Sequence, residues 1–130
     1  MNVLLIDDEK TMHEIMSAFL RRYAQERGIA DMRVTCISDP VEGLFEVTTN
    51  GAHYDIILLD IRMPRLTGDE IYNSIIHIKP ELLQRIMFVT GYRQDLQGRF
   101  TDQSLRILDK PFRYAVLAEA IDEMRAALQR

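Results

Sequence analysis

Short apolar runs alternate along the chain with longer stretches in which apolar residues recur at helical spacing. The run 56–59 consists of four branched apolar residues, which is typical of a strand buried on both faces of a parallel sheet. The runs 2–6, 85–90 and 105–108 predict three further strands. The stretch 32–37 alternates apolar with polar residues and predicts a strand near a sheet edge, with one wetter face.

Helical spacing between the strands predicts the first two helices. Apolar residues over 12–23 form one stripe, and Gly28 can end that helix. Asp39 and Pro40 are a helix-start signal, because an N-cap acid is followed by proline at the first helical position. Gly51 then closes the second helix.

The second half of the chain predicts two well-patterned helices and one weak one. Apolar positions over 71–78 predict a helix that must stop before Pro80, and those over 116–128 predict the last helix. The segment 91–104 is the weakest candidate because Gly98 and many polar residues interrupt its apolar positions. We expect this segment to be short or mobile.

Strands that alternate with helices predict an α/β fold built from right-handed crossovers. We expect a doubly wound, flavodoxin-like (βα)5 sandwich of three layers, with a parallel sheet in the order 2-1-3-4-5. This order brings the carboxyl ends of strands one, three, four and five around one crevice, where open α/β sheets bind ligands.

Composition limits the function classes. With 130 residues and 47% hydrophobic content, the chain fits a single domain over 1–130. The net charge of −4, with no Lys/Arg block, argues against direct nucleic-acid binding. The only cysteine, Cys36, is expected to be a buried core thiol in a reducing compartment. The N-terminal sequence has the pattern of neither a signal peptide nor a membrane span, so we expect a cytoplasmic protein without membrane contact.

Polar residues follow or end four of the expected strands, and these are Asp7 and Asp8, Asp60, Thr90 and Lys110. Two carboxylates about 4 Å apart repel by roughly 4 kcal/mol at an effective dielectric of about 20, so positive charge must lie among the three acids. Mg²⁺, a hard cation that prefers oxygen ligands, would supply it together with Lys110. Such a site favours phosphoryl transfer.

Each of these residues alone has a simpler explanation. An acid after a strand is often only an N-cap of the next helix, and a threonine at a strand end often has no role beyond its place at the strand end. His13, His53 and His77 lack ligand spacing and are expected on the surface or in packing. The joint placement of the acids, the threonine and the lysine is therefore the informative feature.

The motifs resemble, in their order, the receiver domain of bacterial two-component response regulators. The resemblance covers the whole chain and rests on Asp7-Asp8, Asp60, Met63-Pro64 with Gly68, Thr90-Gly91 and Lys110-Pro111-Phe112. It implies a signalling domain that accepts a phosphoryl group and catalyses only its own phosphotransfer and dephosphorylation. It also implies a histidine kinase or phosphotransfer protein as donor, and an effector domain or downstream protein as target.

The resemblance also implies a role for each site residue. Asp60 would be the phosphoacceptor, and Asp8, Asp60 and the backbone carbonyl of Arg62 would bind Mg²⁺ directly. Asp7 would act mainly through a metal-bound water. Lys110 would pair with the phosphoryl oxygens, and its peptide bond to Pro111 would be cis. Thr90 would move to hydrogen-bond one phosphoryl oxygen.

One position departs from the family pattern. Three residues before the lysine, where the family commonly carries tyrosine or phenylalanine, this chain has Ile107. The change leaves the phosphoacceptor chemistry intact but puts in doubt the usual aromatic readout, and with it the surface of the family's dimers. A homodimer therefore stays open.

Two other functions fit these residues less well. A haloacid-dehalogenase-type phosphatase usually carries its nucleophile at the first strand in a D-x-D-x-T pattern, whereas the chain reads Asp7-Asp8-Glu9-Lys10-Thr11 there. A flavodoxin-like FMN carrier is disfavoured because the same acids would repel a phosphate. The sequence leaves open whether the domain stands alone or comes from a longer protein.

Overall fold

The computed structural model describes residues 1–101 and 103–129. Within them, five parallel strands form one sheet in the predicted order β2-β1-β3-β4-β5. The strands are β1 (Asn2–Ile6), β2 (Arg33–Ile37), β3 (Ile56–Leu59), β4 (Ile86–Thr90) and β5 (Ile107–Asp109). The bounds predicted for the last strand, 105–108, were wrong: β5 starts two residues later and includes Asp109.

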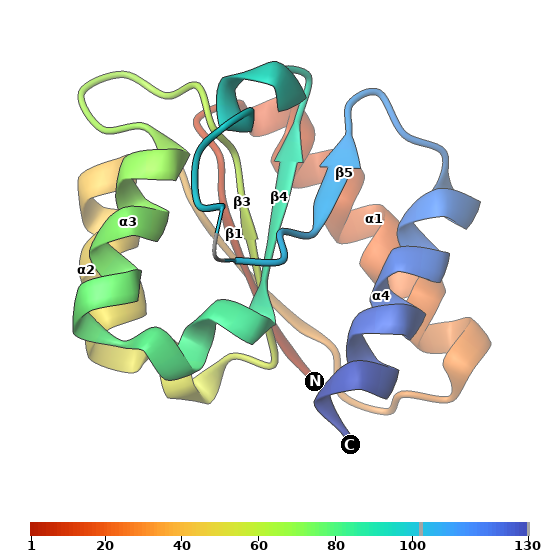
Figure 1. The fold of residues 1–130 in the computed structure, drawn as a ribbon. Helices are drawn as coiled ribbons and strands as arrows, with labels where there is room; N and C mark the ends of the chain where they lie inside the picture. Colours follow the sequence, from red (N-terminus) through yellow and green to blue (C-terminus); the bar gives the residue numbers. More distant parts are fainter. Residues whose placement is uncertain (102, 130) are drawn as a thin grey trace.

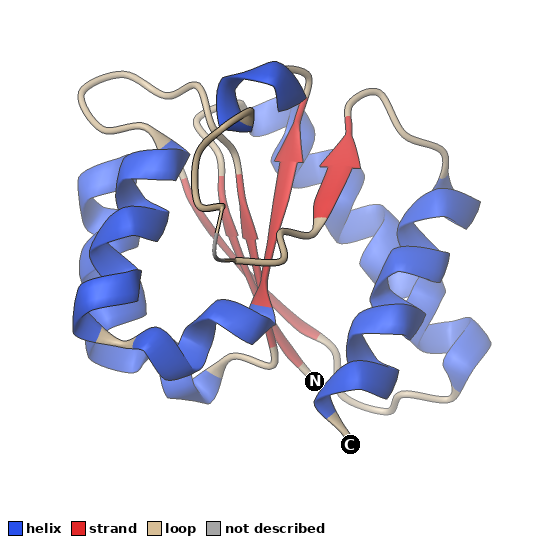
Figure 2. Ribbon diagram, viewed as in Figure 1, coloured by secondary structure: helices blue, strands red, loops and turns tan. Residues whose placement is uncertain are grey.

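In the part of the chain that the structure describes, four α-helices cover the sheet in two layers. They are α1 (Lys10–Arg27), α2 (Pro40–Asn50), α3 (Gly68–Ile78) and α4 (Tyr114–Leu128). Helices α1 and α4 lie on one face and α2 and α3 on the other, with both chain ends at the same end of the sheet (Figures 1 and 2). No helix in the described part of the chain is both long and apolar enough to cross a membrane.

The continuous apolar runs are explained by burial on both faces of the sheet. In β1, Val3 and Leu5 pack into the apolar cluster under α1 and α4, whereas Leu4 and Ile6 pack into the cluster under α2 and α3. Because successive side chains of a strand point to opposite faces, a central strand buries side chains on both faces of the sheet, which favours apolar residues along its whole length. All four residues of β3 are buried for the same reason.

Several local signals act as predicted. Gly28 ends α1 in the left-handed conformation, with φ of 66°. The side chain of Asp39 accepts a hydrogen bond from the Val41 amide and caps α2. Gly43 lies inside α2 where a Cβ would come within 2.7 Å of the Ile6 side chain, so this glycine lets the helix approach the sheet closely.

The weak segment between β4 and β5 does not form the α-helix of a regular repeat. Short 3-10 turns occur elsewhere as η1 (Gly51–His53) and η2 (Pro80–Arg85), and in the described part of 91–104 the only helical element is η3 (Arg93–Leu96). Gly98 and Phe100 then adopt positive φ values of 75° and 55°, which an α-helix does not allow. The expectation of a short helix is confirmed, and position 102 lies outside the described residues.

The described part of the segment 91–104 lacks an α-helix, and side-chain contacts with α3 fix its position instead. Phe100 packs edge to face on Tyr72 with ring centres 4.8 Å apart, and Arg99 forms an ion pair with the nearly buried Asp69. The segment is therefore fixed to the helix that follows β3.

The edge strand β2 has the expected wetter face, since Arg33 and Thr35 are exposed. Cys36 is only partly buried and packs against the cluster under α1 and α4, so the expectation of a buried core thiol was wrong. The cause is its place on an edge strand, where no neighbouring strand covers the outer side.

Candidate functional site

Three carboxylates meet at the carboxyl ends of β1 and β3. The Asp7 amide donates to Ile37 O over 3.1 Å and the Asp60 amide donates to Ile6 O over 3.0 Å, so the sheet pairing extends one residue past each strand. Asp7 is fully buried, Asp60 is 5% exposed and Asp8 is exposed. One oxygen from each of the three carboxylates lies within 4.8 Å of the others.

Lys110 supplies the positive charge that three neighbouring carboxylates require. Its backbone amide donates to Thr90 O over 2.9 Å, and the peptide bond to Pro111 is cis, as the resemblance implied. The Lys110 ammonium nitrogen lies 2.8 Å from Asp7 Oδ2, 3.5 Å from Asp60 Oδ1 and 3.9 Å from Glu9 Oε1. The three acids and the lysine are thus together in one site.

Burial sets the protonation of the central acid. Removal from water, reinforced by the neighbouring Asp7 charge, raises the pKa of Asp60 to about 6, although Lys110 and the Ile61 amide act in the opposite direction. For Lys110, burial alone would lower the pKa, but the hydrogen bond to Asp7 and the surrounding carboxylates raise it overall. The lysine therefore stays charged while Asp60 binds its proton unusually well.

The loop after β3 requires Gly68. A Cβ at this position would clash with the backbone carbonyl of Asp60, and the Gly68 amide donates to Ile61 O over 2.8 Å. Helix α3 starts there, and the Glu70 carboxylate accepts hydrogen bonds from the Thr67 amide and hydroxyl at its first turn. The glycine thus allows the helix to begin directly against Asp60.

Thr90 ends β4, and Arg62 lies in the loop after β3, two residues past Asp60. Thr90 is fully buried, and its hydroxyl accepts a hydrogen bond of 2.9 Å from the Tyr92 amide. The Arg62 side chain binds Asp95. The proposed metal ligand is the backbone carbonyl of Arg62, and its role stays a prediction. Ile107 is partly buried and packs against the cluster under α2 and α3.

Two contacts at the site have no counterpart among the predictions from the sequence, that of Glu9 with Lys110 and that of Arg62 with Asp95. Glu9 lies near Lys110, and the His13 ring Nε2 lies 2.5 Å from Asp7 O, which fits the expected packing role of this histidine. The ion pair between Arg62 and Asp95 joins residues 33 positions apart. Glu9 lies far along the chain from Lys110, and so does Arg62 from Asp95, so sequence spacing carries no signal for these two contacts.

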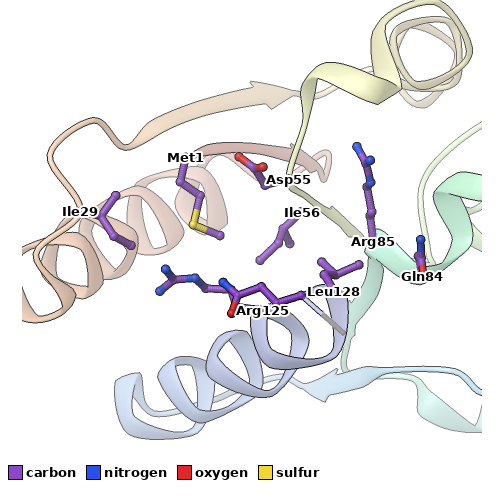
Figure 3. A pocket seen from close by; sticks show the side chains of 9 residues that line it. Met1, Ile29, Asp55, Ile56, Gln84, Arg85, Arg125 and Leu128 are labelled. Atoms are coloured by element: carbon purple, nitrogen blue, oxygen red, sulfur yellow. The ribbon is translucent and has the colours of Figure 1, made fainter.

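A hollow of about 580 Å³ lies at the opposite end of the sheet, lined by Met1, Ile29, Asp55, Ile56, Gln84, Arg85, Arg125, Leu128 and Gln129 (Figure 3). Its charged groups are partnered within the fold. Arg125 donates to the Tyr23 hydroxyl, Arg85 donates to the Tyr54 carbonyl, and Asp55 accepts from the Asn2 amide. The chemistry of the molecule is therefore concentrated at the acidic cluster and not at this hollow.

Comparison with known proteins identifies the family. The model of the response regulator receiver domain matches residues 3–122. The chain belongs to the response regulator receiver domain family. It is 30% identical over 124 residues to an uncharacterized response regulatory protein of Vibrio cholerae, covering 95% of this chain and 48% of that protein. This receiver domain therefore spans about half the length of the curated relatives it matches.

Solved structures agree with the receiver fold. A response regulator receiver domain protein from Clostridium thermocellum has a TM-score of 0.78 and 26% identity, covering 99% of this chain and 98% of that one. The receiver domain of the sensor histidine kinase PA1611 from Pseudomonas aeruginosa has a TM-score of 0.77 and 23% identity, covering 96% and 97%. That structure carries a magnesium ion in its active-site cleft.

Proposed function

We propose that this receiver domain accepts a phosphoryl group on Asp60 from a histidine kinase or a phosphotransfer protein, in a Mg²⁺-dependent reaction. The phosphoryl group then switches the interactions of the domain in two-component signal transduction. The observation that carries the proposal is the nearly buried Asp60 carboxylate, which lies within reach of Asp7, Asp8 and the Lys110 ammonium group.

The donor set fits Mg²⁺. The three carboxylates offer hard oxygen atoms within 4.8 Å of one another, and Asp8 faces solvent, from which an ion can enter. Asp8, Asp60 and the carbonyl of Arg62 would hold the ion, with Asp7 acting through a bound water. When bound, Mg²⁺ would neutralise the charge of the carboxylates and of the phosphoryl oxygens, and it would keep open coordination positions for the phosphoryl oxygens.

The chain's own residues have distinct parts in the transfer. An Asp60 oxygen attacks the phosphorus atom, the new P–O bond forms as the P–N bond to the donor histidine breaks, and the electron pair leaves with the imidazole. The Lys110 ammonium group then balances the charge of the phosphoryl oxygens. The Thr90 hydroxyl, now bound to the Tyr92 amide, can turn to donate a hydrogen bond to one of them.

Other parts of the proposal concern the whole protein. We propose that residues 1–130 act as one receiver domain whose catalysis is limited to its own phosphorylation and dephosphorylation, and whose target is an effector domain or a downstream protein. We also predict a cytoplasmic location and no direct binding to nucleic acid. Whether the domain forms a homodimer stays open.

The test uses acetyl phosphate as a small donor with Mg²⁺. Intact-protein mass spectrometry should show one added phosphoryl group that is lost in base, and Asp60→Asn should abolish it because an amide does not attack phosphorus. Asp31→Asn, which removes an exposed carboxylate before β2, is the matched control and should label normally. A label on a histidine or a hydroxyl group, or a label retained in Asp60→Asn, would overturn the assignment.

A further inference from the structure

The turn 7–9, between β1 and α1, carries two of the three clustered carboxylates, and a side chain of α1 binds its backbone. His13 lies at the start of α1, and its ring Nε2 lies 2.5 Å from Asp7 O. A carbonyl oxygen only accepts hydrogen bonds, so Nε2 carries the proton and donates it. The histidine is partly buried, so its ring makes this bond from a packed position.

This hydrogen bond completes the anchoring of Asp7. The Asp7 amide donates to Ile37 O over 3.1 Å, and the Lys110 ammonium nitrogen lies 2.8 Å from Oδ2. The Glu9 amide donates to Oδ1 over 2.9 Å. His13 binds the carbonyl oxygen, which is the remaining polar group of the residue. The backbone of Asp7 and its carboxylate are therefore both fixed in orientation.

Asp8 depends on the same peptide unit for its position. Of the three clustered acids, Asp8 alone is exposed, so burial does not hold its side chain. The carbonyl that His13 binds belongs to the peptide bond between Asp7 and Asp8. A peptide unit is planar, so fixing this oxygen also fixes the direction in which the chain reaches the Asp8 Cα atom. The contact of His13 with the turn thereby helps to aim the Asp8 carboxylate at the cluster.

We propose that His13 is a positioning residue, which holds the Asp7–Asp8 peptide so that the Asp8 carboxylate is ready to bind Mg²⁺. The inference rests on the proposed Mg²⁺-dependent function, in which Asp8 is a direct ligand. A turn that is already ordered loses less conformational entropy when the ion binds, and this raises the affinity. The place of Asp60 does not depend on the histidine, because its amide pairs with Ile6 O in the sheet.

The test measures the Mg²⁺ dissociation constant of variants of the 130-residue chain by isothermal titration calorimetry at a single pH. His13→Phe keeps a ring and His13→Leu does not, but both remove the donor. Both should raise the dissociation constant by about two- to tenfold, the factor that corresponds to one hydrogen bond. His13→Gln should restore most of the affinity, because its Nε2 is separated from Cβ by as many bonds as the histidine Nε2 and can donate to the same carbonyl.

A control variant and a second measurement separate positioning from a general loss of structure. His77→Leu, at an exposed histidine in the last turn of α3, should bind Mg²⁺ like the wild type. Amide hydrogen exchange of His13→Phe without the ion should be faster at Glu9, whose amide donates to Asp7 within the turn. Exchange at Leu20, in the middle of α1, should be unchanged.

Each outcome decides the inference. An unchanged Mg²⁺ affinity in His13→Phe and His13→Leu, an equal loss in His77→Leu, or no recovery in His13→Gln overturns the role of His13 alone. Faster exchange throughout α1 also overturns it, because the histidine would then act only on the stability of the helix. A wild-type protein that binds no Mg²⁺ overturns this inference together with the proposed function.

Discussion

The ammonium group of Lys110 lies closer to Asp7 than to Asp60, at 2.8 Å against 3.5 Å from the nearest carboxylate oxygen. Asp7 is fully buried, and the Lys110 side chain is 15% exposed. Lys110 is therefore the direct counter-ion of Asp7 and only a shared neighbour of Asp60. A buried charge of this kind becomes costly when its partner is removed.

Lys110→Met tests this relationship. The variant should lower the free energy of unfolding by about 1–3 kcal/mol at neutral pH without Mg²⁺, since Asp7 would stay buried without a partner. Adding Asp7→Asn should recover part of the loss because the uncompensated charge is then gone. Lys10→Met, at an exposed lysine at the start of α1, is the control and should change stability little. Denaturant unfolding of these four proteins and of Asp7→Asn alone gives the answer, and additive losses in the double variant would contradict the pairing.

A second prediction concerns pH. The folded-state pKa of Asp60 is about 6, above the ordinary value of 3.8. Between these values the folded protein binds more protons than the unfolded chain, so this group stabilises the fold at low pH, and its contribution is lost as pH rises through about 6. Asp60→Asn removes the charge and should be more stable than the wild type by about 1–2 kcal/mol at pH 7 without Mg²⁺.

Measuring the free energy of unfolding of the wild type and of Asp60→Asn across pH separates the contribution of Asp60 from that of the other acids. The stability difference should be small near pH 4, grow up to about pH 6 and then level off, as the pKa of Asp60 requires. Adding Mg²⁺ should narrow the gap at neutral pH, because the ion stabilises the charged wild-type site. A difference that is constant across this range would contradict the raised pKa.

A third prediction concerns the metal. Mg²⁺ that binds only the folded protein at a hundred times its dissociation constant should stabilise it by about 2.7 kcal/mol. Asp8→Asn should remove most of this stabilisation, since it deletes both a ligand and a charge. Thermal melts with and without Mg²⁺ measure it, with Asp31→Asn as a control that keeps the full response. An unchanged melting temperature of the wild type at saturating Mg²⁺ would count against the site.

The sequence was sufficient where a local pattern and a general rule of sheets combine. The buried run 56–59 and the acids after β1 and β3 predicted the central strands and the cluster, because the carboxyl ends of parallel strands meet at one edge. Gly28 and the Asp39-Pro40 pair likewise marked helix ends correctly. Each of these sequence signals determines the backbone conformation of only the few residues around it.

The sequence was insufficient where distant contacts decide the structure. Tyr72 and Asp69 in α3 hold Phe100 and Arg99, and no pattern within 91–104 predicts these partners. The same holds for the pair of Arg62 with Asp95. The start of β5 was misplaced because Leu105 packs into the core without belonging to the strand, so its apolar character imitates a strand position.

The last prediction concerns how the domain reports phosphorylation. Ile107 pairs with Phe88 in the sheet and packs partly buried against the cluster under α2 and α3. A β-branched side chain is stiff at χ1 and gains little from exposure, so Ile107 should stay inward in both states. The preceding segment is held instead by side-chain contacts at Asp95, Arg99 and Phe100, which can exchange at lower cost than sheet pairing.

Amide hydrogen exchange with and without beryllofluoride, a phosphoryl mimic, tests this expectation. The largest change in protection should fall between Thr90 and Ser104, because Thr90 must give up its bond with the Tyr92 amide to reach the phosphoryl group. Ile107 should change little, because its strand pairing with β4 persists. Asp60→Asn treated in the same way provides the control without a bound mimic. A change confined to 105–109, with the preceding segment silent, would show that strand β5 carries the signal after all.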